Sequence, residues 1–358
     1  MRTADFDFTL PPELIAQHPA PRRDDSRLLV WRRDNGRVEH RKFRELLEYL
    51  HAGDVLVLNN SRVIPARLRA TQADSGGRFE ILLVEENARN DWWAMLRPGK
   101  RARPGTPLVL QDTQGGPTAI RAMVLEVNEA GHRRLQFSGT PDLKQELERL
   151  GEVPLPPYIT RRNPDEMSED RERYQTVFAQ TGGSIAAPTA GLHFTPELLD
   201  QIRRRGVQVL FVTLHVGPGT FLPVKAGVLT GHRMHEERFE LGEEAAHAVN
   251  AAKAAGRRVL AVGTTTVRVM ESVAAQNGGK LVKYSGKTGI FIHPPFRFQI
   301  VDGLLTNFHL PRSTLLMLVS AFAAPEATRG GELTLSVYAE AIQAGYHFYS
   351  YGDAMFIL

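Results

Sequence analysis

The sequence of 358 residues contains no cysteine, which excludes disulfide bonds, thiolate metal ligands and a cysteine nucleophile. It also lacks a long apolar run. Its most hydrophobic stretch, residues 315–323, has nine residues, whereas a membrane-spanning helix needs about 20. Residues 1–8 show no apolar segment typical of a signal peptide. We therefore expect a cytoplasmic protein that does not contact a membrane.

Neither sign of charge dominates, because 44 Lys and Arg residues stand against 40 Asp and Glu residues and the net charge is +4. The arginines nevertheless cluster along the chain. Local basic patches can bind the phosphates of a polyanion even when the total charge is small, although scattered basic pairs are more often solvated surface. The clusters are Arg22 with Arg23, Arg32 with Arg33, Arg101 with Arg103, Arg133 with Arg134, Arg161 with Arg162, Arg203 to Arg205, and Arg257 with Arg258.

The apolar pattern divides the chain into two parts. Residues 61–155 carry short runs of alternating apolar and polar residues between turns rich in Gly, Asp and Asn, which is typical of a small barrel or sandwich. Residues 1–60 and 156–358 alternate between apolar strands and amphipathic helices, which predicts a sheet covered by helices. We expect an α/β core domain (residues 1–60 and 156–358) with an inserted small antiparallel β-barrel domain (residues 61–155).

Within the core, Thr195 and Ser313 are expected to cap helices, and the charged segment 161–173 is expected to be an exposed loop. The predicted helices cover residues 43–50, 196–205, 243–255, 264–275, 313–323 and 335–344, and the predicted strands cover residues 55–58, 207–216, 259–262, 290–292 and 348–358.

The densest chemical signal lies in two loops rich in Gly, Thr and Pro, at residues 186–195 and 212–221. Each loop carries one histidine, His193 in the first and His215 in the second. Glycine lets a backbone approach a ligand closely, and histidine transfers protons near neutral pH. Because ligands gather beyond the carboxyl ends of strands in an α/β sheet, the loop after the strand at 207–216 is a candidate site. A satisfied structural histidine is the alternative.

Three further segments could bind ligands. Gly263 with Thr264 and Thr265 forms a strand-to-helix turn that could hold an anion, although a plain capped turn would look the same. The segment 231–236 has a His-x-x-His-Glu spacing but no evident third ligand, so we predict a polar loop and no metal. In the segment 306–314, His309 and Arg312 are hard to explain as turn formers alone.

Taken together, these residues make the chain similar to the S-adenosylmethionine:tRNA ribosyltransferase-isomerase family of queuosine biosynthesis. It departs from the family pattern at Glu152, Pro295, Ser336 and Val337, which concerns local loop shape. The matching blocks are LIAQHP at 14–19, GD at 53–54, NNSRVIPAR at 59–67, PLPPYI at 154–159, YQTV at 174–177, AAPTAGLHF at 186–194, VTLHVG at 212–217, GTF at 219–221, AVGTT at 261–265, DG at 302–303, TNFHLP at 306–311 and YGDAM at 351–355.

The resemblance implies a fold and an activity. Such an enzyme moves the ribosyl group of S-adenosylmethionine onto the aminomethyl-deazaguanine at the wobble position of a tRNA and isomerises it. The product is epoxyqueuosine, and adenine and methionine are released. S-adenosylmethionine is consumed as a co-substrate, and no metal or redox cofactor is implied. The family also implies a monomer with an α/β core and an inserted β-barrel.

This chemistry needs several proton transfers, which suit histidine. The candidates are His193, His215 and His309, with their individual roles left open. The residues expected to bind S-adenosylmethionine are Gly217, Gly219, Thr220, Gly263, Thr264 and Thr265, and those expected to contact tRNA are Arg67, Arg312 and Tyr158.

Two alternatives remain open from the residues alone. An S-adenosylmethionine-dependent RNA methyltransferase is disfavoured, because no Gly-rich turn follows an early strand. A non-catalytic RNA-binding protein would account for the arginine pairs but would leave the loops with His, Gly and Thr unexplained.

Overall fold

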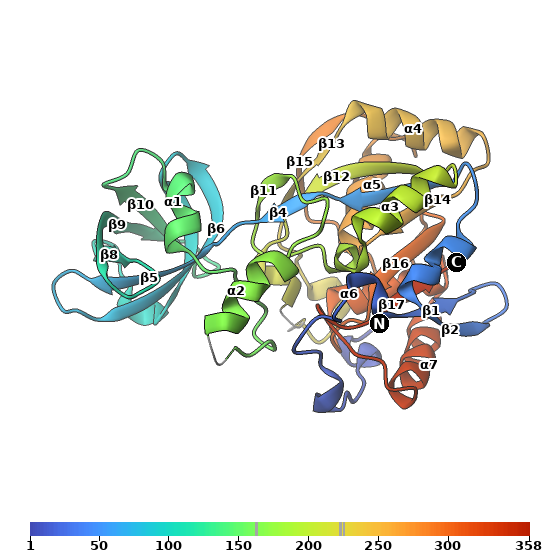
Figure 1. The fold of residues 1–358 in the computed structure, drawn as a ribbon, viewed down its shortest axis with the longest axis horizontal. Helices are drawn as coiled ribbons and strands as arrows, with labels where there is room; N and C mark the ends of the chain where they lie inside the picture. Colours follow the sequence, from blue (N-terminus) through green and yellow to red (C-terminus); the bar gives the residue numbers. More distant parts are fainter. Residues whose placement is uncertain (162–163, 222–223, 225) are drawn as a thin grey trace.

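The computed structural model describes residues 1–161, 164–221, 224 and 226–358. Figure 1 shows a large core that carries both chain termini, and a smaller barrel beside it. The core contains a mixed sheet, and the barrel closes with six antiparallel strands. The predicted fold class, an α/β core with an inserted small antiparallel β-barrel, is therefore confirmed.

The core sheet has nine strands. Its four central strands, β12, β3, β14 and β16, run parallel to one another. Their carboxyl ends consequently meet at one edge of the sheet, where ligands gather in α/β folds. In sheet order the strands are β15 (Tyr284–Thr288), β13 (Glu237–Leu241), β12 (Gln208–Leu214), β3 (Val55–Asn59), β14 (Val259–Val262), β16 (Gly303–Asn307), β17 (Ala354–Ile357), β1 (Arg27–Trp31) and β2 (Val38–Lys42).

Both faces of this sheet are covered, as the apolar sequence of β3 requires. Val55 and Val57 point into one hydrophobic cluster, and Leu56 and Leu58 point into another on the opposite face, because successive side chains of a strand alternate. The first cluster includes residues of α4 (Glu243–Ala254), α5 (Thr264–Gln276), α6 (Thr314–Ala323) and α7 (Gly330–Gln343), and the second includes residues of the 3-10 helices η4 (Phe43–Tyr49) and η6 (Thr189–His193) and of α3 (Pro196–Arg204).

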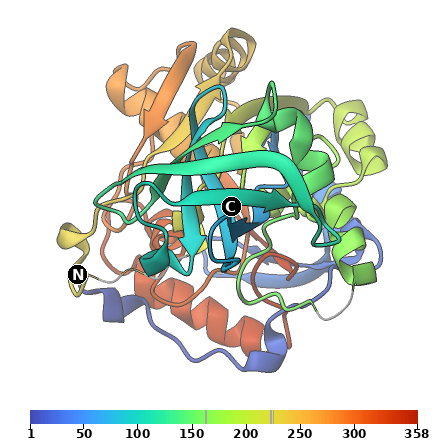
Figure 2. The ribbon, with the colours of Figure 1, turned by 90° about the vertical axis from the view of Figure 1, so that its left-hand side faces the viewer.

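The barrel lies in front of the core when the molecule is seen from the left-hand side of Figure 1 (Figure 2). Its inward side chains form a separate hydrophobic cluster, and α1 (Leu143–Leu150) contributes three buried leucines to that cluster. The predicted boundaries at residues 60/61 and 155/156 stay a prediction. Around the barrel the strands are β10 (Arg133–Ser138), β7 (Asp91–Arg97), β6 (Arg78–Ala88), β5 (Arg67–Gln72), β8 (Pro107–Gln111) and β9 (Pro117–Val127).

The chain crosses between core and barrel along a second, two-stranded sheet. In it, β4 (Ser61–Val63) runs parallel to β11 (Thr181–Ser184), and both lie between the two parts in Figure 1. On the barrel side, Arg67 forms a β-bridge with Glu152, so the outgoing and returning segments are hydrogen-bonded to each other. The outgoing and returning segments of the chain therefore stabilise each other between the core and the barrel.

Two of the predicted core elements are wrong. The segment 161–173 is no exposed loop, because residues Pro164–Arg173 form the helix α2. Its Asp170 is buried and accepts hydrogen bonds from Arg161 at 2.6 and 2.9 Å, a pairing that charge content alone does not reveal. The apolar run at residues 290–292 is not a strand, and β15 lies just before it. Across the described ranges, no helix is both long and apolar enough to cross a membrane.

Candidate active site

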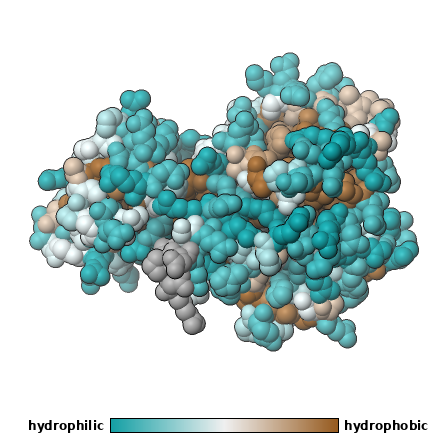
Figure 3. All heavy atoms as spheres, in the orientation of Figure 1, coloured by the Kyte–Doolittle hydropathy of each residue, from teal (hydrophilic) through white to brown (hydrophobic). Residues whose placement is uncertain are grey.

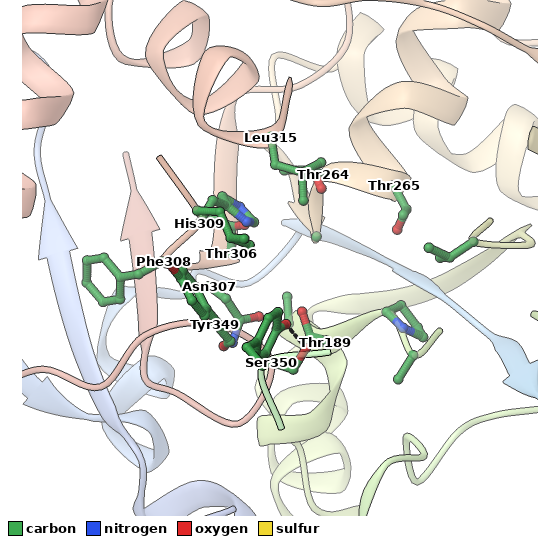
Figure 4. A pocket seen from close by; sticks show the side chains of 17 residues that line it. Thr189, Thr264, Thr265, Thr306, Asn307, Phe308, His309, Leu315, Tyr349 and Ser350 are labelled. Atoms are coloured by element: carbon green, nitrogen blue, oxygen red, sulfur yellow. Dashed lines mark hydrogen bonds between the residues drawn. The ribbon is translucent and has the colours of Figure 1, made fainter. Parts of the chain in front are cut away.

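The carboxyl ends of β14 and β16 open into a small pocket (Figure 4) with a cavity volume of about 50 Å³. Its lining combines hydroxyl-bearing side chains with apolar side chains such as Val216, Phe308 and Leu315. This lining suits a polar ligand with several hydrogen-bonding groups. The polar lining residues are Tyr158, Thr189, Thr264, Thr265, Thr306, Asn307, His309, Tyr349 and Ser350.

The amino terminus of α5 forms one wall of the pocket. Gly263 precedes the helix with φ of +86°, a left-handed conformation that glycine adopts without strain. Its N–H donates to the carbonyl of Leu305 on the neighbouring strand, at 2.7 Å. The N–H groups of the first turn, at Thr264 and Thr265, have no partner inside an α-helix. The first turn of α5 therefore leaves N–H groups free to face an anionic group, and binding at Gly263, Thr264 and Thr265 stays a prediction.

Asn307, at the end of β16, offers a hydrogen-bond acceptor to the same pocket. Its side chain is buried (2% exposed), and its Nδ2 lies 3.2 Å from the carbonyl oxygen of Tyr349 and 3.2 Å from Nε2 of His193. Because a carbonyl can only accept, the amide nitrogen must face Tyr349. Oδ1 is then left buried without a hydrogen-bond partner among the described residues. A buried unpaired acceptor is costly, so this atom is suited to a ligand that donates.

His193 holds that amide in place. Its Nε2 must accept from Asn307, so Nδ1 carries the proton and donates to Oγ of Ser26 at 2.7 Å. The ring also stacks on Phe43 with 4.9 Å between centroids. Burial, aided by the nearby charge of Arg23, lowers the pKa of His193 to about 3. With both ring nitrogens occupied, the predicted proton-transfer role of His193 is not supported, and we assign it a positioning role.

His309 lines the pocket directly, beyond the end of β16. Its Nε2 lies 2.8 Å from Oγ1 of Thr306, and its backbone N–H donates to the hydroxyl of Tyr338. Burial lowers the pKa of His309 to about 3. The imidazole is therefore neutral at pH 7, and its predicted part in proton transfer stays a prediction.

His215 lies elsewhere, in a cleft of about 720 Å³ between the barrel and the core. Its Nδ1 is buried without a hydrogen-bond partner in the part of the chain that the structure describes. The ring packs against Gly183, where an added Cβ would lie 3.0 Å from it. Burial, with a contribution from Arg238, lowers the pKa of His215. Val216 lines both the cleft and the pocket, so the two cavities adjoin.

The three predicted histidines are thus not brought together in one cavity. His309 lines the pocket, His215 lines the cleft, and His193 lies behind Asn307 beside a further small cavity. A shared site of paired imidazoles at His193 and His215, which the two loops suggested, is therefore not found.

The glycine loop after β12 belongs to the cleft. The N–H of Gly217 donates to Oε1 of Glu237 at 2.9 Å, and a Cβ on Gly219 would lie 2.5 Å from the ring of His235. The side chain of Thr220 lies outside the described residues. Of the six residues predicted to bind S-adenosylmethionine, the pocket contains those at 263–265, and the cleft contains Gly217.

The three residues predicted to bind tRNA lie in different surroundings. Arg67 is half-buried, and its Nη2 donates to the carbonyl of Leu155 at 3.2 Å, beside the crossing into the barrel. Arg312 is exposed and paired with Asp7. Tyr158 lines the pocket, where burial raises its pKa.

The sequence interpretation missed Ser26, Thr189 and Ser350. Thr189 lies within the block at 186–194, which was a usable signal. Ser26 contacts His193, which is 167 positions away in the sequence, and no local sequence pattern predicts such a contact. The segment 231–236 contributes His235 and Glu236 to the cleft, and no group of three His, Asp or Glu residues that could hold a metal occurs within the described ranges.

Acidification should destabilise the fold through His193 and His309. The pKa of each is about 3 in the folded chain and 6.5 ordinarily. Between pH 6.5 and pH 3 only the unfolded chain binds the proton. The free energy of unfolding therefore decreases as the pH is lowered through this range, by about 1.4 kcal/mol per pH unit for each histidine. The free energy of unfolding should be measured with urea at pH 7 and at pH 5, for the wild type and for His309→Gln. Its decrease between the two pH values should be about 2 kcal/mol smaller in His309→Gln than in the wild type. Equal losses would contradict this.

Comparisons with known proteins agree with the resemblance. Residues 3–357 match the family model described as "Queuosine biosynthesis protein". The chain is 53% identical over 357 residues (99% of this chain, 98% of the relative) to the S-adenosylmethionine:tRNA ribosyltransferase-isomerase of Thermus thermophilus. It is 48% identical over 358 residues, the whole of both chains, to that of Desulfitobacterium hafniense.

A solved structure is also similar. The S-adenosylmethionine tRNA ribosyltransferase of Thermotoga maritima is 40% identical, and the match covers 99% of this chain and 100% of that one with a TM-score of 0.55. The family match, the identities and this fold agree over the full length of the chain. The chain therefore belongs to the queuosine biosynthesis protein family.

Proposed function

We propose that this chain is an S-adenosylmethionine:tRNA ribosyltransferase-isomerase, as its relatives are named. It transfers the ribosyl group of S-adenosylmethionine to the aminomethyl-deazaguanine of a tRNA wobble position and isomerises it to epoxyqueuosine, with release of adenine and methionine. S-adenosylmethionine is consumed as a co-substrate. The observation that carries the proposal is the buried, unpaired Oδ1 of Asn307 beside the amino terminus of α5.

The pocket accounts for two hydrogen-bonding groups of S-adenosylmethionine, the carboxylate of its methionine part and a hydroxyl of its ribose. The first-turn N–H groups at Thr264 and Thr265 receive the methionine carboxylate, and Oδ1 of Asn307 accepts from a ribose hydroxyl. At about 50 Å³ the pocket is smaller than the roughly 300–1,000 Å³ usual for small-molecule sites. The remainder of the molecule therefore extends past Val216 into the cleft.

The chemistry begins at the ribose carbon next to the positively charged sulfur, whose C–H bond the sulfonium acidifies. A base must take that proton, adenine must be protonated as it leaves, and the tRNA amine must lose a proton to attack. His215 is the proton-transfer residue of our proposal, because its lowered pKa keeps it neutral at pH 7 and it lines the cleft that adjoins the pocket. A positioned acid or base contributes about 10²–10⁴-fold to a rate.

The cleft receives the anticodon of the tRNA. Its two walls come from the barrel and the core, and Trp93 of β7 and His132 of the β9–β10 turn face the cavity from the barrel side. Bases that RNA-binding proteins recognise are splayed out of the strand and stacked on aromatic side chains, which fits Trp93. One chain forms both pocket and cleft, which supports a monomer as the active species.

Identification of the reaction products tests the proposed function. Protein should be incubated with S-adenosylmethionine and a tRNA that carries the aminomethyl-deazaguanine, and the nucleosides and small molecules should be identified by mass spectrometry. We expect epoxyqueuosine with equal amounts of adenine and methionine, and no change in a tRNA with ordinary guanine at that position. Methylated RNA with S-adenosylhomocysteine would establish a methyltransferase instead.

A further inference from the structure

One region of the barrel carries positive charge that the described residues do not neutralise. It consists of the start of β6, the end of β7 and the segment around the 3-10 helix η5 (Gly99–Arg101). We call its five exposed cations the barrel cation surface, and none of them forms an ion pair with another residue that the structure describes. They are Arg78, Arg97, Lys100, Arg101 and Arg103.

Several other cations of the barrel form ion pairs, unlike these five. Arg134 contacts Asp91 at 2.6 Å and Glu126 at 3.0 Å, and Lys144 contacts Glu86 at 3.0 Å. Within the barrel cation surface, Glu80 faces Arg97 in the β6–β7 register, so local carboxylates balance only part of the charge. Figure 3 shows that the barrel side of the molecule is largely hydrophilic. The surface therefore suits a polyanion rather than an apolar partner.

The backbone holds these cations close together. Arg78 lies at the start of β6, two residues before Glu80, which pairs with Arg97 at the end of β7, and η5 follows Arg97 after Pro98. Arg133 anchors the η5 segment through two hydrogen bonds. Its Nη2 donates to the carbonyl of Gly99 at 2.6 Å, and its Nε donates to the carbonyl of Ala102 at 3.4 Å. The cations around η5 are therefore carried on an anchored loop.

Arg133 also links this loop to the cleft. Its Nη1 donates to the carbonyl of Gly131, in the turn between β9 and β10. The neighbours of Gly131 in that turn, Asn128, Ala130 and His132, line the cleft. The barrel cation surface thus adjoins the rim of the cavity in which His215 lies. An RNA strand that placed a base in the cleft would carry its phosphates across this rim.

We propose that the barrel cation surface binds the phosphate backbone of the substrate RNA next to the cleft. This inference rests on the proposed function, since it names where the tRNA of that reaction is held. Phosphate contacts set the register of a nucleic acid without reading its sequence. The surface therefore contributes to tRNA affinity and to its dependence on salt, and it leaves the binding of S-adenosylmethionine unaffected.

The test is a triple variant, Lys100→Gln with Arg101→Gln and Arg103→Gln. The dissociation constant of the tRNA complex should be measured by filter binding at several salt concentrations. Each lost phosphate contact removes about 0.7 from the slope of log K against log salt for a single strand, so the loss of three contacts should lower the slope by about 2. At low salt, tRNA affinity should fall at least tenfold. The Michaelis constant for S-adenosylmethionine should stay within twofold.

A matched control removes the same charge elsewhere. Arg37, Arg44 and Arg203 are exposed on the core and lie near carboxylates, so their replacement by Gln should leave the slope unchanged. An unchanged slope and affinity in the folded barrel variant would overturn the inference, as would an equal change in both variants. Wild-type protein that binds tRNA through this surface but forms no epoxyqueuosine would instead contradict the proposed function alone.

Discussion

Replacement of Arg268 by methionine is expected to lower the free energy of unfolding by about 3–5 kcal/mol. Arg268 of α5 pairs with Glu237 of β13, and the two side chains are only 4% and 5% exposed. Glu237 also accepts from the N–H of Gly217 in the cleft wall. Without the guanidinium, its carboxylate would remain buried next to a neutral side chain, and burial of an uncompensated charge is strongly destabilising. Urea unfolding at pH 7 measures the loss.

Arg203→Met is the matched control. Arg203 pairs with Asp200 at 3.0 Å, and the two side chains are 48% and 62% exposed. The control should change the free energy of unfolding by no more than about 0.5 kcal/mol, because exposed ion pairs contribute little. Adding Glu237→Gln to Arg268→Met should restore part of the lost stability. A loss below about 1 kcal/mol in Arg268→Met would show that the pair does not stabilise the sheet edge.

Replacement of Asn307 by alanine is expected to lower kcat/KM for S-adenosylmethionine by about 10–100-fold. The variant removes the buried Oδ1 that we assign to a ribose hydroxyl, and a hydrogen bond of that kind is worth about 1–3 kcal/mol when its partner is left buried and unpaired. Steady-state rates of adenine release, at varied S-adenosylmethionine and saturating tRNA, measure the effect. We expect the change mainly in the Michaelis constant.

The same substitution leaves His193 without its partner, so folding must be checked by circular dichroism at the assay temperature. Asn277→Ala is the control, since that side chain donates to the carbonyl of Val273 at 2.7 Å and lies at the other end of α5. It should leave kcat/KM unchanged. A change of less than threefold in folded Asn307→Ala would remove Asn307 from the binding site.

Local signals predicted much of the fold. The strand at 259–262 was predicted to the residue, because a basic pair precedes its four apolar residues and Gly263 ends it. The caps at Thr195 and Ser313 were predicted because a hydroxyl residue at that position satisfies a first-turn N–H. The strands β1 and β2 were not predicted, and the helix α2 was mistaken for a loop because its buried partner, Arg161, cannot be recognised from charge content.

The site was predictable only in part. The turn at 263–265 carries its own signal, a strand followed by Gly and Thr residues, and it lines the pocket. The roles of the histidines depend on contacts across long stretches of chain. His193 meets Ser26 and Asn307, which are 167 and 114 positions away, and these contacts occupy both ring nitrogens. Sequence composition cannot show that a histidine is saturated with hydrogen bonds.

Labelled co-substrate shows whether the ribosyl group of S-adenosylmethionine is transferred to the wobble base of a tRNA. Two reactions should be run with the same tRNA, one with ¹³C in the ribose carbons of S-adenosylmethionine and one with ¹³C in its methyl group. We expect the tRNA nucleoside to gain all of the ribose label and none of the methyl label. Methyl label in the tRNA, with ribose label retained on a nucleoside product in solution, would contradict it.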